Sequence, residues 1–116
     1  MKRIALLLTL ALAGCEGDEA TTPTAERCDD VPTVSWDTFG HGFLTAYCQG
    51  CHADTAENRH GAPTSVAFGT PEDAVTHKDR IRARATGESP DMPPAGGPNA
   101  AELERLEIWL TCFDAR

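Results

Sequence analysis

The chain has 116 residues, of which 18 are Asp or Glu and 10 are Lys or Arg, so its formal net charge is −8. A chain of this length holds one small domain, which excludes a large multidomain enzyme. The acidic balance argues against sequence-independent binding of DNA or RNA, because such binding needs Lys and Arg to neutralise phosphates. Hydrophobic residues make up 41%, enough for a small core of the kind that a disulfide or a cofactor usually supports.

The N-terminus has the pattern of an export signal. Lys2 and Arg3 precede an apolar run over residues 4–13, which is too short to span a bilayer as a helix. The run ends in Leu-Ala-Gly-Cys, which resembles a bacterial lipobox, in which the cysteine is lipidated and becomes the first mature residue. We therefore predict a lipoprotein signal peptide over 1–14 and an exported protein that lipidated Cys15 anchors at the periplasmic or outer face of a bacterial membrane. The alternative is an ordinary signal peptide with a chance cysteine.

The segment after Cys15 has a composition unlike that of the rest of the chain. Residues 16–27 carry no large apolar side chain, so the segment cannot bury enough surface to order itself. We expect a flexible tether over 15–27 and a folded domain over 28–116.

Three helices are expected in this domain, and none of its segments has the alternation of a strand. The first spans about 35–47, where one apolar stripe recurs at helical spacing. The second begins after Thr70, a suitable cap followed by proline and acidic residues, and runs to about Ala85. The third begins after Asn99, with a glutamate three residues later as in a capping box. Long Gly- and Pro-rich loops (59–69 and 88–98) separate the helices and need something to pack on.

The motif that carries chemistry is Cys48-Gln49-Gly50-Cys51-His52, directly after the first helix. C-x-x-C-H is the attachment sequence for c-type haem. Two thiols at this spacing reach the two vinyl groups of one porphyrin and form thioethers, and the adjacent histidine then reaches the iron. Covalent attachment of this kind holds a cofactor even in an open, water-exposed domain.

The motif has three other interpretations. A thioredoxin-like redox pair expects a βαβ context, which the sequence does not have. A zinc site from Cys48, Cys51, His52 and His60 would usually need a second pair of ligands, and no second C-x-x-C is present. A disulfide loop with a chance histidine is the third. The export signal, the preceding helix and a later methionine favour haem.

With this motif the chain resembles the class I cytochrome c family, in particular the small haem domains of bacterial lipoproteins, over about 35–112. Gly40 and Leu44 match the family's glycine and large apolar residue before the motif, and Leu106 and Trp109 match the apolar-x-x-aromatic pair of its last helix. The resemblance implies an all-α, cytochrome c-like fold of about three helices with long loops around one covalent haem c. It also implies that the first and last helices cross closely at the glycine.

The resemblance further implies the surroundings of the iron. Pro63 would accept the proton of the free ring nitrogen of His52 through its carbonyl, which orients the ligand. Met92, in Asp-Met-Pro-Pro, would be the sixth ligand, and His/Met ligation raises the reduction potential. His41, His60 and His77 are alternative sixth ligands. Haem-packing candidates, with core packing as an equal alternative, are Phe39, Phe68 and Trp109.

Two of the five cysteines remain after lipid and haem attachment. Cys28 precedes the first helix and Cys112 ends the last, and the resemblance brings these helices together. We predict a disulfide between them, because two free thiols are unusual in an exported protein.

The expected function is electron transfer by a monohaem c-type cytochrome lipoprotein, which carries single electrons through a His/Met-ligated haem outside the cytoplasm and is not an enzyme. Its partners would be redox proteins with basic patches, since complementary charge raises encounter rates, and the membrane through the lipid anchor. The alternative is a haem-based small-ligand sensor or binding module with a labile sixth ligand.

Overall fold

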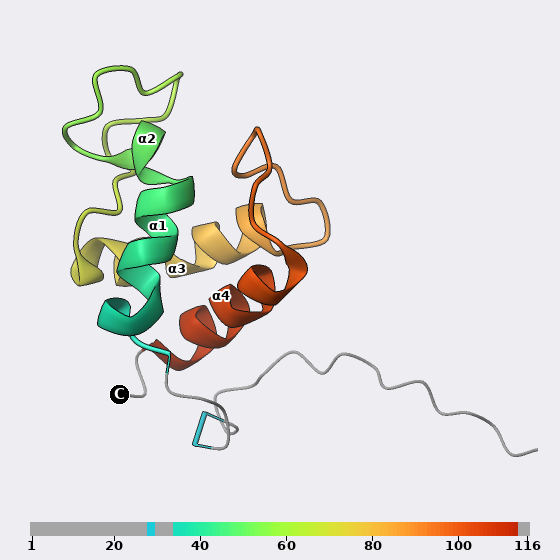
Figure 1. Ribbon diagram of the computed structural model, residues 1–116. Helices are drawn as coiled ribbons and strands as arrows, with labels where there is room; N and C mark the ends of the chain where they lie inside the picture. Colours follow the sequence, from blue (N-terminus) through green and yellow to red (C-terminus); the bar gives the residue numbers. More distant parts are fainter. Residues whose placement is uncertain (1–27, 30–33, 114–116) are drawn as a thin grey trace, which may run out of the picture.

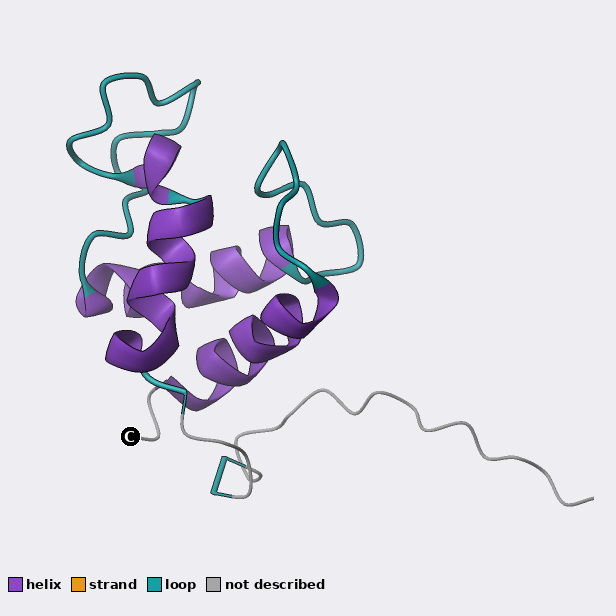
Figure 2. Ribbon diagram, viewed as in Figure 1, coloured by secondary structure: helices purple, strands orange, loops and turns teal. Residues whose placement is uncertain are grey.

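The computed structural model of the protein describes residues 28–29 and 34–113 (Figure 1). The predicted signal peptide, the lipidated Cys15 and the tether lie outside these residues. Figure 2 shows helices joined by loops, and within the described ranges the chain forms no strand, which confirms the all-α class. None of the helices described here has the length and apolar character needed to cross a membrane.

The first predicted helix is present, but its first turn is wider than an α-helix. Ser35 caps a π-helical turn, Trp36–Gly40, with a reciprocal capping box, and α1 (His41–Tyr47) continues it. After a break at Cys48 the chain resumes as the short α2 (Gln49–His52). The C-x-x-C-H motif therefore lies on a helical turn, whereas the sequence predicted only that it follows a helix.

The second and third predicted helices begin where their caps place them. The side chain of Thr70 accepts the N–H of the third helical residue of α3 (Pro71–Ala85). Asn99 does the same for α4 (Ala100–Cys112). In both helices the acidic residue at that third position bonds back to the N–H of the cap, so each start has two backbone donors satisfied.

The crossing of the first helical segment with α4 has a glycine at its contact point. A Cβ built on Gly40 would lie 2.6 Å from Cε2 and 2.8 Å from Cη2 of Trp109, so only glycine permits the observed approach. Leu44, Leu106 and Trp109 are fully buried beside it. The close crossing expected at this glycine is thus present.

The helices form a base from which two loops rise. In Figure 1, α1 and α4 cross at the front while α3 runs behind them, and the loops over 53–70 and 86–99 extend from the same end of the molecule. Side chains join the helices pairwise: Arg82 of α3 bonds to Glu107 of α4 at 2.7 Å, and the Tyr47 hydroxyl of α1 donates to Glu102 at 2.9 Å.

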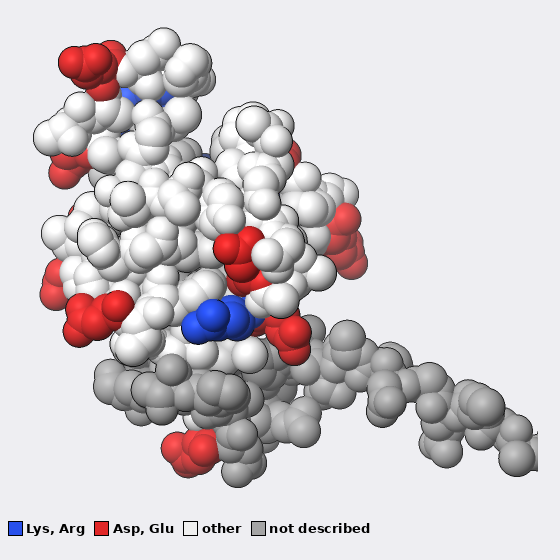
Figure 3. All heavy atoms as spheres, viewed as in Figure 1, with Lys and Arg blue, Asp and Glu red and all other residues white. Residues whose placement is uncertain are grey.

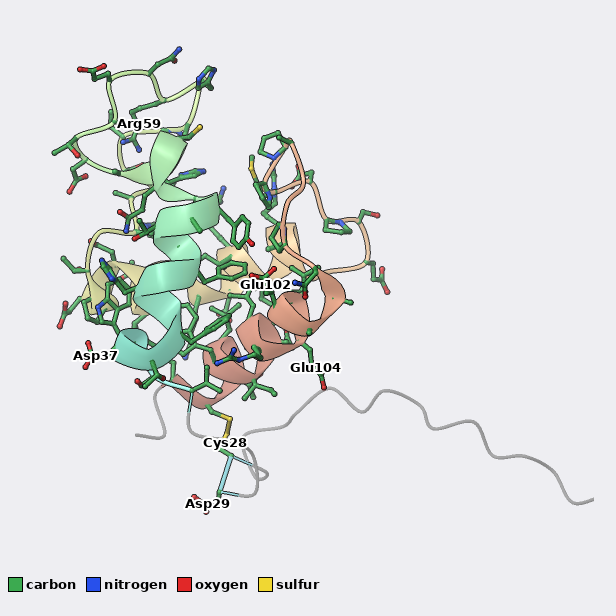
Figure 4. All side chains as sticks on the ribbon, viewed as in Figure 1. Cys28, Asp29, Asp37, Arg59, Glu102 and Glu104 are labelled. Carbon is green, nitrogen blue, oxygen red and sulfur yellow. A yellow bond between two sulfur atoms is a disulfide. The ribbon has the colours of Figure 1, made fainter. Side chains whose placement is uncertain are left out.

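A disulfide joins Cys28 to Cys112 at the end of the molecule away from the two loops (Figure 4). Their Cα atoms are 5.4 Å apart, and both residues are buried. This is the pairing predicted from the sequence.

Candidate cofactor site

A cavity of about 390 Å³ lies between the motif and the loop after α3. Cys48, Cys51 and His52 line one side of it. Met92 and the two prolines that follow line another, and residues of α1, of α3 and of the loop between α2 and α3 complete the wall. In Figure 3 the molecule is hollowed between the two rising loops. The chain therefore brings its motif and its one internal methionine to a single cavity.

The charge of this lining differs from that of the chain as a whole. Although the chain has 18 acidic residues, no Asp or Glu lines the cavity, whereas three arginines do, Arg59, Arg80 and Arg84. The acidic side chains in the view of Figure 3 lie around the outside of the molecule. The cavity thus combines a largely apolar surface with cationic groups, which suits an apolar ligand that carries negative charge.

The two motif cysteines are free thiols that are half-buried at the cavity wall. Burial, and to a smaller extent the charge of Cys51, raises the pKa of the Cys48 thiol to about 12. Cys48 is therefore a neutral thiol at physiological pH.

Three contacts with Val66 and Phe68 hold His52 in place. Its Nδ1 lies 2.9 Å from the carbonyl oxygen of Val66. Because a carbonyl only accepts, Nδ1 carries the proton and the lone pair of Nε2 is available to a metal. The ring stacks on Phe68 at 4.8 Å between centroids, and the Phe68 N–H donates to the His52 carbonyl. These contacts fix both the tautomer and the orientation of the imidazole.

The role predicted for Pro63 is wrong, because Val66 fills it. The Pro63 carbonyl instead accepts from the Arg59 guanidinium at 2.7 Å and from the Val66 N–H at 3.0 Å. Pro63 still lines the cavity. The Pro63 carbonyl closes the turn that contains Val66, so Pro63 supports the residue that bonds to His52 and does not bond to His52 itself.

Met92 is half-buried and is attached to the end of α3. Its N–H and that of Asp91 both donate to the Arg84 carbonyl at 2.9 Å. The side chains of Arg84 and Asp91 form an ion pair at 2.5 Å. The backbone of the methionine loop is therefore tied to a helix beside the cavity.

The other sequence candidates divide into residues at the cavity and residues away from it. His60 lines it, whereas His41 packs against Trp36 and His77 contacts the edge of Phe68. Phe68 also lines the cavity, but Phe39 and Trp109 belong to the helix core. In the part of the chain that the structure describes, no three His, Cys, Asp or Glu side chains group to hold a metal ion, so the four residues weighed for zinc are not assembled.

Two residues at the site were not found from the sequence. Val66 acts through its carbonyl, which every residue type carries, so its identity gives no signal. Arg59 lines the cavity and bonds the loop after α2 (Figure 4). The only sequence signal for Arg59 is its place as a lone arginine in a Gly- and Pro-containing loop beside the motif.

The chain was compared with protein-family models, with curated proteins and with solved structures, and it matches none of them. Its function therefore has to be argued from the site, since a helical fold alone is compatible with many functions.

Proposed function

We propose that this chain is a monohaem c-type cytochrome, tethered outside the cytoplasm by lipidated Cys15, that carries single electrons between redox proteins and is not an enzyme. The observation that carries the proposal is the donor set of one cavity: two thiols, an imidazole with its Nε2 lone pair available, and a thioether. When bound there, haem c supplies a one-electron ferrous/ferric couple.

Each donor has a separate task in this proposal. Cys48 and Cys51, which are unpaired thiols at the cavity wall, would hold the porphyrin as thioethers. His52 would supply an imidazole ligand to the iron, and the Val66 carbonyl at 2.9 Å and the ring of Phe68 orient it. Met92 would supply a thioether ligand to the iron, and the bonds to Arg84 restrain its loop. A filled sixth position leaves no open site for a reacting molecule, which suits electron transfer better than catalysis.

The charge of the cavity supports the same ligand. Haem carries two propionate groups, which bind cationic side chains. Of the three arginines in the lining, Arg59 bonds backbone carbonyls and Arg84 pairs with Asp91. Arg80 is exposed and lines the cavity, which makes it a candidate propionate partner. The acidic outer surface would favour redox partners with basic patches, because opposite charges raise the rate of encounter.

The first test is the visible spectrum of the mature domain, exported by a host with cytochrome c maturation machinery. We expect a low-spin c-type spectrum with a methionine–iron band in the oxidised state. Met92→Leu keeps an apolar side chain of similar size and removes the sulfur, so the variant should lose the band, bind carbon monoxide when reduced and have a lower reduction potential.

The outcomes separate the proposal from its alternatives. A c-type spectrum without the methionine band in the wild type would exclude Met92 as ligand and favour the ligand-sensor alternative, or ligation by His60, which also lines the cavity. A protein without haem would overturn the proposal. Cys48→Ala and Cys51→Ala should each leave one thioether, which the haem-staining of a denatured gel and mass spectrometry would show.

A further inference from the structure

The guanidinium of Arg59 is the centre of the loop that follows the motif (Figure 4). It donates to four backbone carbonyls: Ala62 at 3.1 Å, Ala53 at 2.5 Å, Pro63 at 2.7 Å and Val66 at 3.0 Å. Ala53 directly follows His52, so one side chain connects the end of the motif with the segment that returns to it. Five N–H donors in a rigid fork make arginine the side chain suited to this task.

One of the four carbonyls also accepts a hydrogen bond from His52. The Val66 oxygen accepts from the imidazole Nδ1 at 2.9 Å and from the guanidinium at 3.0 Å. A carbonyl oxygen has two lone pairs, so the two donors share one acceptor. The half-buried Arg59 forms none of the ion pairs found among the described residues. Its positive charge therefore acts directly on the hydrogen bond that orients His52.

We propose that Arg59 is a positioning residue that, through the Val66 carbonyl, sets how strongly His52 donates to the haem iron and thereby raises the reduction potential. This inference rests on the proposed function and extends it to a residue that touches neither iron ligand directly.

The positive charge of Arg59 raises the reduction potential through two physical effects. A cation on the Val66 oxygen weakens the pull of that oxygen on the Nδ1 proton, so the imidazole is a weaker donor and the ferric state is stabilised less. The charge at the cavity wall also disfavours the extra positive charge of ferric iron. Loss of the guanidinium should therefore lower the potential. A side chain that keeps the positive charge but not the forked hydrogen-bond geometry should lower it by a smaller amount.

The test compares three variants of the haem-loaded protein by potentiometric titration. Arg59→Gln removes charge and fork, Arg59→Lys keeps the charge without the fork, and Arg105→Gln removes an equal charge on α4. Arg105 is exposed over the Phe39 ring at 4.9 Å and does not line the cavity, so it controls for net charge. We expect Arg59→Gln to lower the equilibrium constant for reduction about three- to tenfold, where tenfold is 59 mV for a one-electron couple. Arg59→Lys should fall between it and the control.

A second measurement reports the positioning of the loop. In the reduced protein, the N–H of Val66, which donates to the Pro63 carbonyl, should exchange with solvent faster in both Arg59 variants than in Arg105→Gln, because the guanidinium no longer bonds the surrounding carbonyls. If Arg59→Gln loses haem, Arg59→Lys supplies the potential and the exchange rates. Equal potentials in the Arg59 variants and the control, or unchanged exchange, would overturn the inference. A wild type without haem would refute the proposed function instead, and that result is obtained before any variant is made.

Discussion

Gly40 is the residue on which the helix crossing depends. Replacing it with alanine would place a methyl group 2.6 Å from Cε2 of Trp109, and the fully buried indole has little room to move. Gly40→Ala should therefore destabilise the protein by about 1–3 kcal/mol, the usual range for an overpacked core. Urea unfolding followed by circular dichroism measures this change.

Gly42, two residues away on α1, is the matched control. A Cβ at Gly42 meets nothing within 4 Å, so Gly42→Ala should stabilise the helix by about 0.5–1 kcal/mol. If the two substitutions had the same effect, the close approach at Gly40 would not be the cause.

Tyr47 provides a pH-dependent link between α1 and α4. The pKa of its phenol is raised, mainly by the hydrogen bond to the Glu102 carboxylate. Desolvation and the charge of Glu102 contribute less to this rise. The stabilisation from this bond is present below the unfolded pKa of about 10 and is lost as the pH rises through the higher folded pKa. Ultraviolet difference spectroscopy can follow this group alone, because Tyr47 is the chain's single tyrosine.

Glu102→Gln tests the cause of that shift. Glutamine can keep the capping box of α4 but removes the negative charge, so the phenol should titrate at lower pH than in the wild type. An unchanged titration midpoint would contradict the role of Glu102.

At the scale of single residues, the sequence predicts which side chains belong to the site better than it predicts which backbone groups they bond to. Cys48, Cys51, His52 and Met92 could be selected because their chemistry is specific to their residue types, and all four line the cavity. The acceptor for His52 could not, because it is a carbonyl whose position depends on the path of the loop. That path brings Val66, three residues beyond the predicted Pro63, to the imidazole.

At the scale of elements, a polar network holds α3 against α4. Arg82 donates to Glu107 at 2.7 Å and to Thr111 at 3.1 Å, and Thr86 donates to the other Glu107 oxygen at 2.7 Å. The Glu107 side chain is only 16% exposed. Its removal would leave the Arg82 Nε–H without this partner in a partly dry interface, which is more costly than loss of a surface pair. The Thr86 hydroxyl could still donate to the Arg82 carbonyl, 3.0 Å away.

Glu107→Ala should therefore lower the free energy of unfolding by about 1–2 kcal/mol. Asp79→Ala removes the other carboxylate that Arg82 contacts, but Asp79 is 84% exposed, so this control should change stability by less than about 0.5 kcal/mol. Denaturant unfolding of both variants gives the comparison, and equal losses would show that burial of Glu107 is unimportant.

The starts of α3 and α4 were predictable because their caps are local: Thr70 and Asn99 each bond within one turn. The π-helical turn at Trp36–Gly40 was not, since its apolar stripe also fits an ordinary helix. It lies where Gly40 packs on Trp109, a contact between residues far apart in the chain. Local caps therefore predict where α3 and α4 begin, whereas the π-helical turn coincides with a contact that no local pattern encodes.

At the scale of the whole molecule, the disulfide lies at the end away from the two loops that contribute to the cavity lining (Figure 4). Neither Cys28 nor Cys112 lines the cavity. The bridge joins the point where the predicted tether enters the domain to the last turn of α4. In the proposed lipoprotein, a force on the anchor would therefore reach the bridge and α4 before the loops that line the cavity.

This separation predicts that the bridge and the site can be uncoupled. The bridge spans 84 positions of sequence, and closing so long a loop stabilises a protein by up to about 4–5 kcal/mol in the chain-entropy model. The double variant Cys28→Ala/Cys112→Ala should lose much of this, measured by the urea midpoint, while its haem spectrum at low temperature stays that of the wild type. The corresponding double serine variant should be less stable still, because the two positions are 5% and 1% exposed and bury the added hydroxyls. An unchanged midpoint in the alanine variant would contradict a stabilising bridge, and loss of the haem spectrum under native conditions would show that core and cavity are coupled.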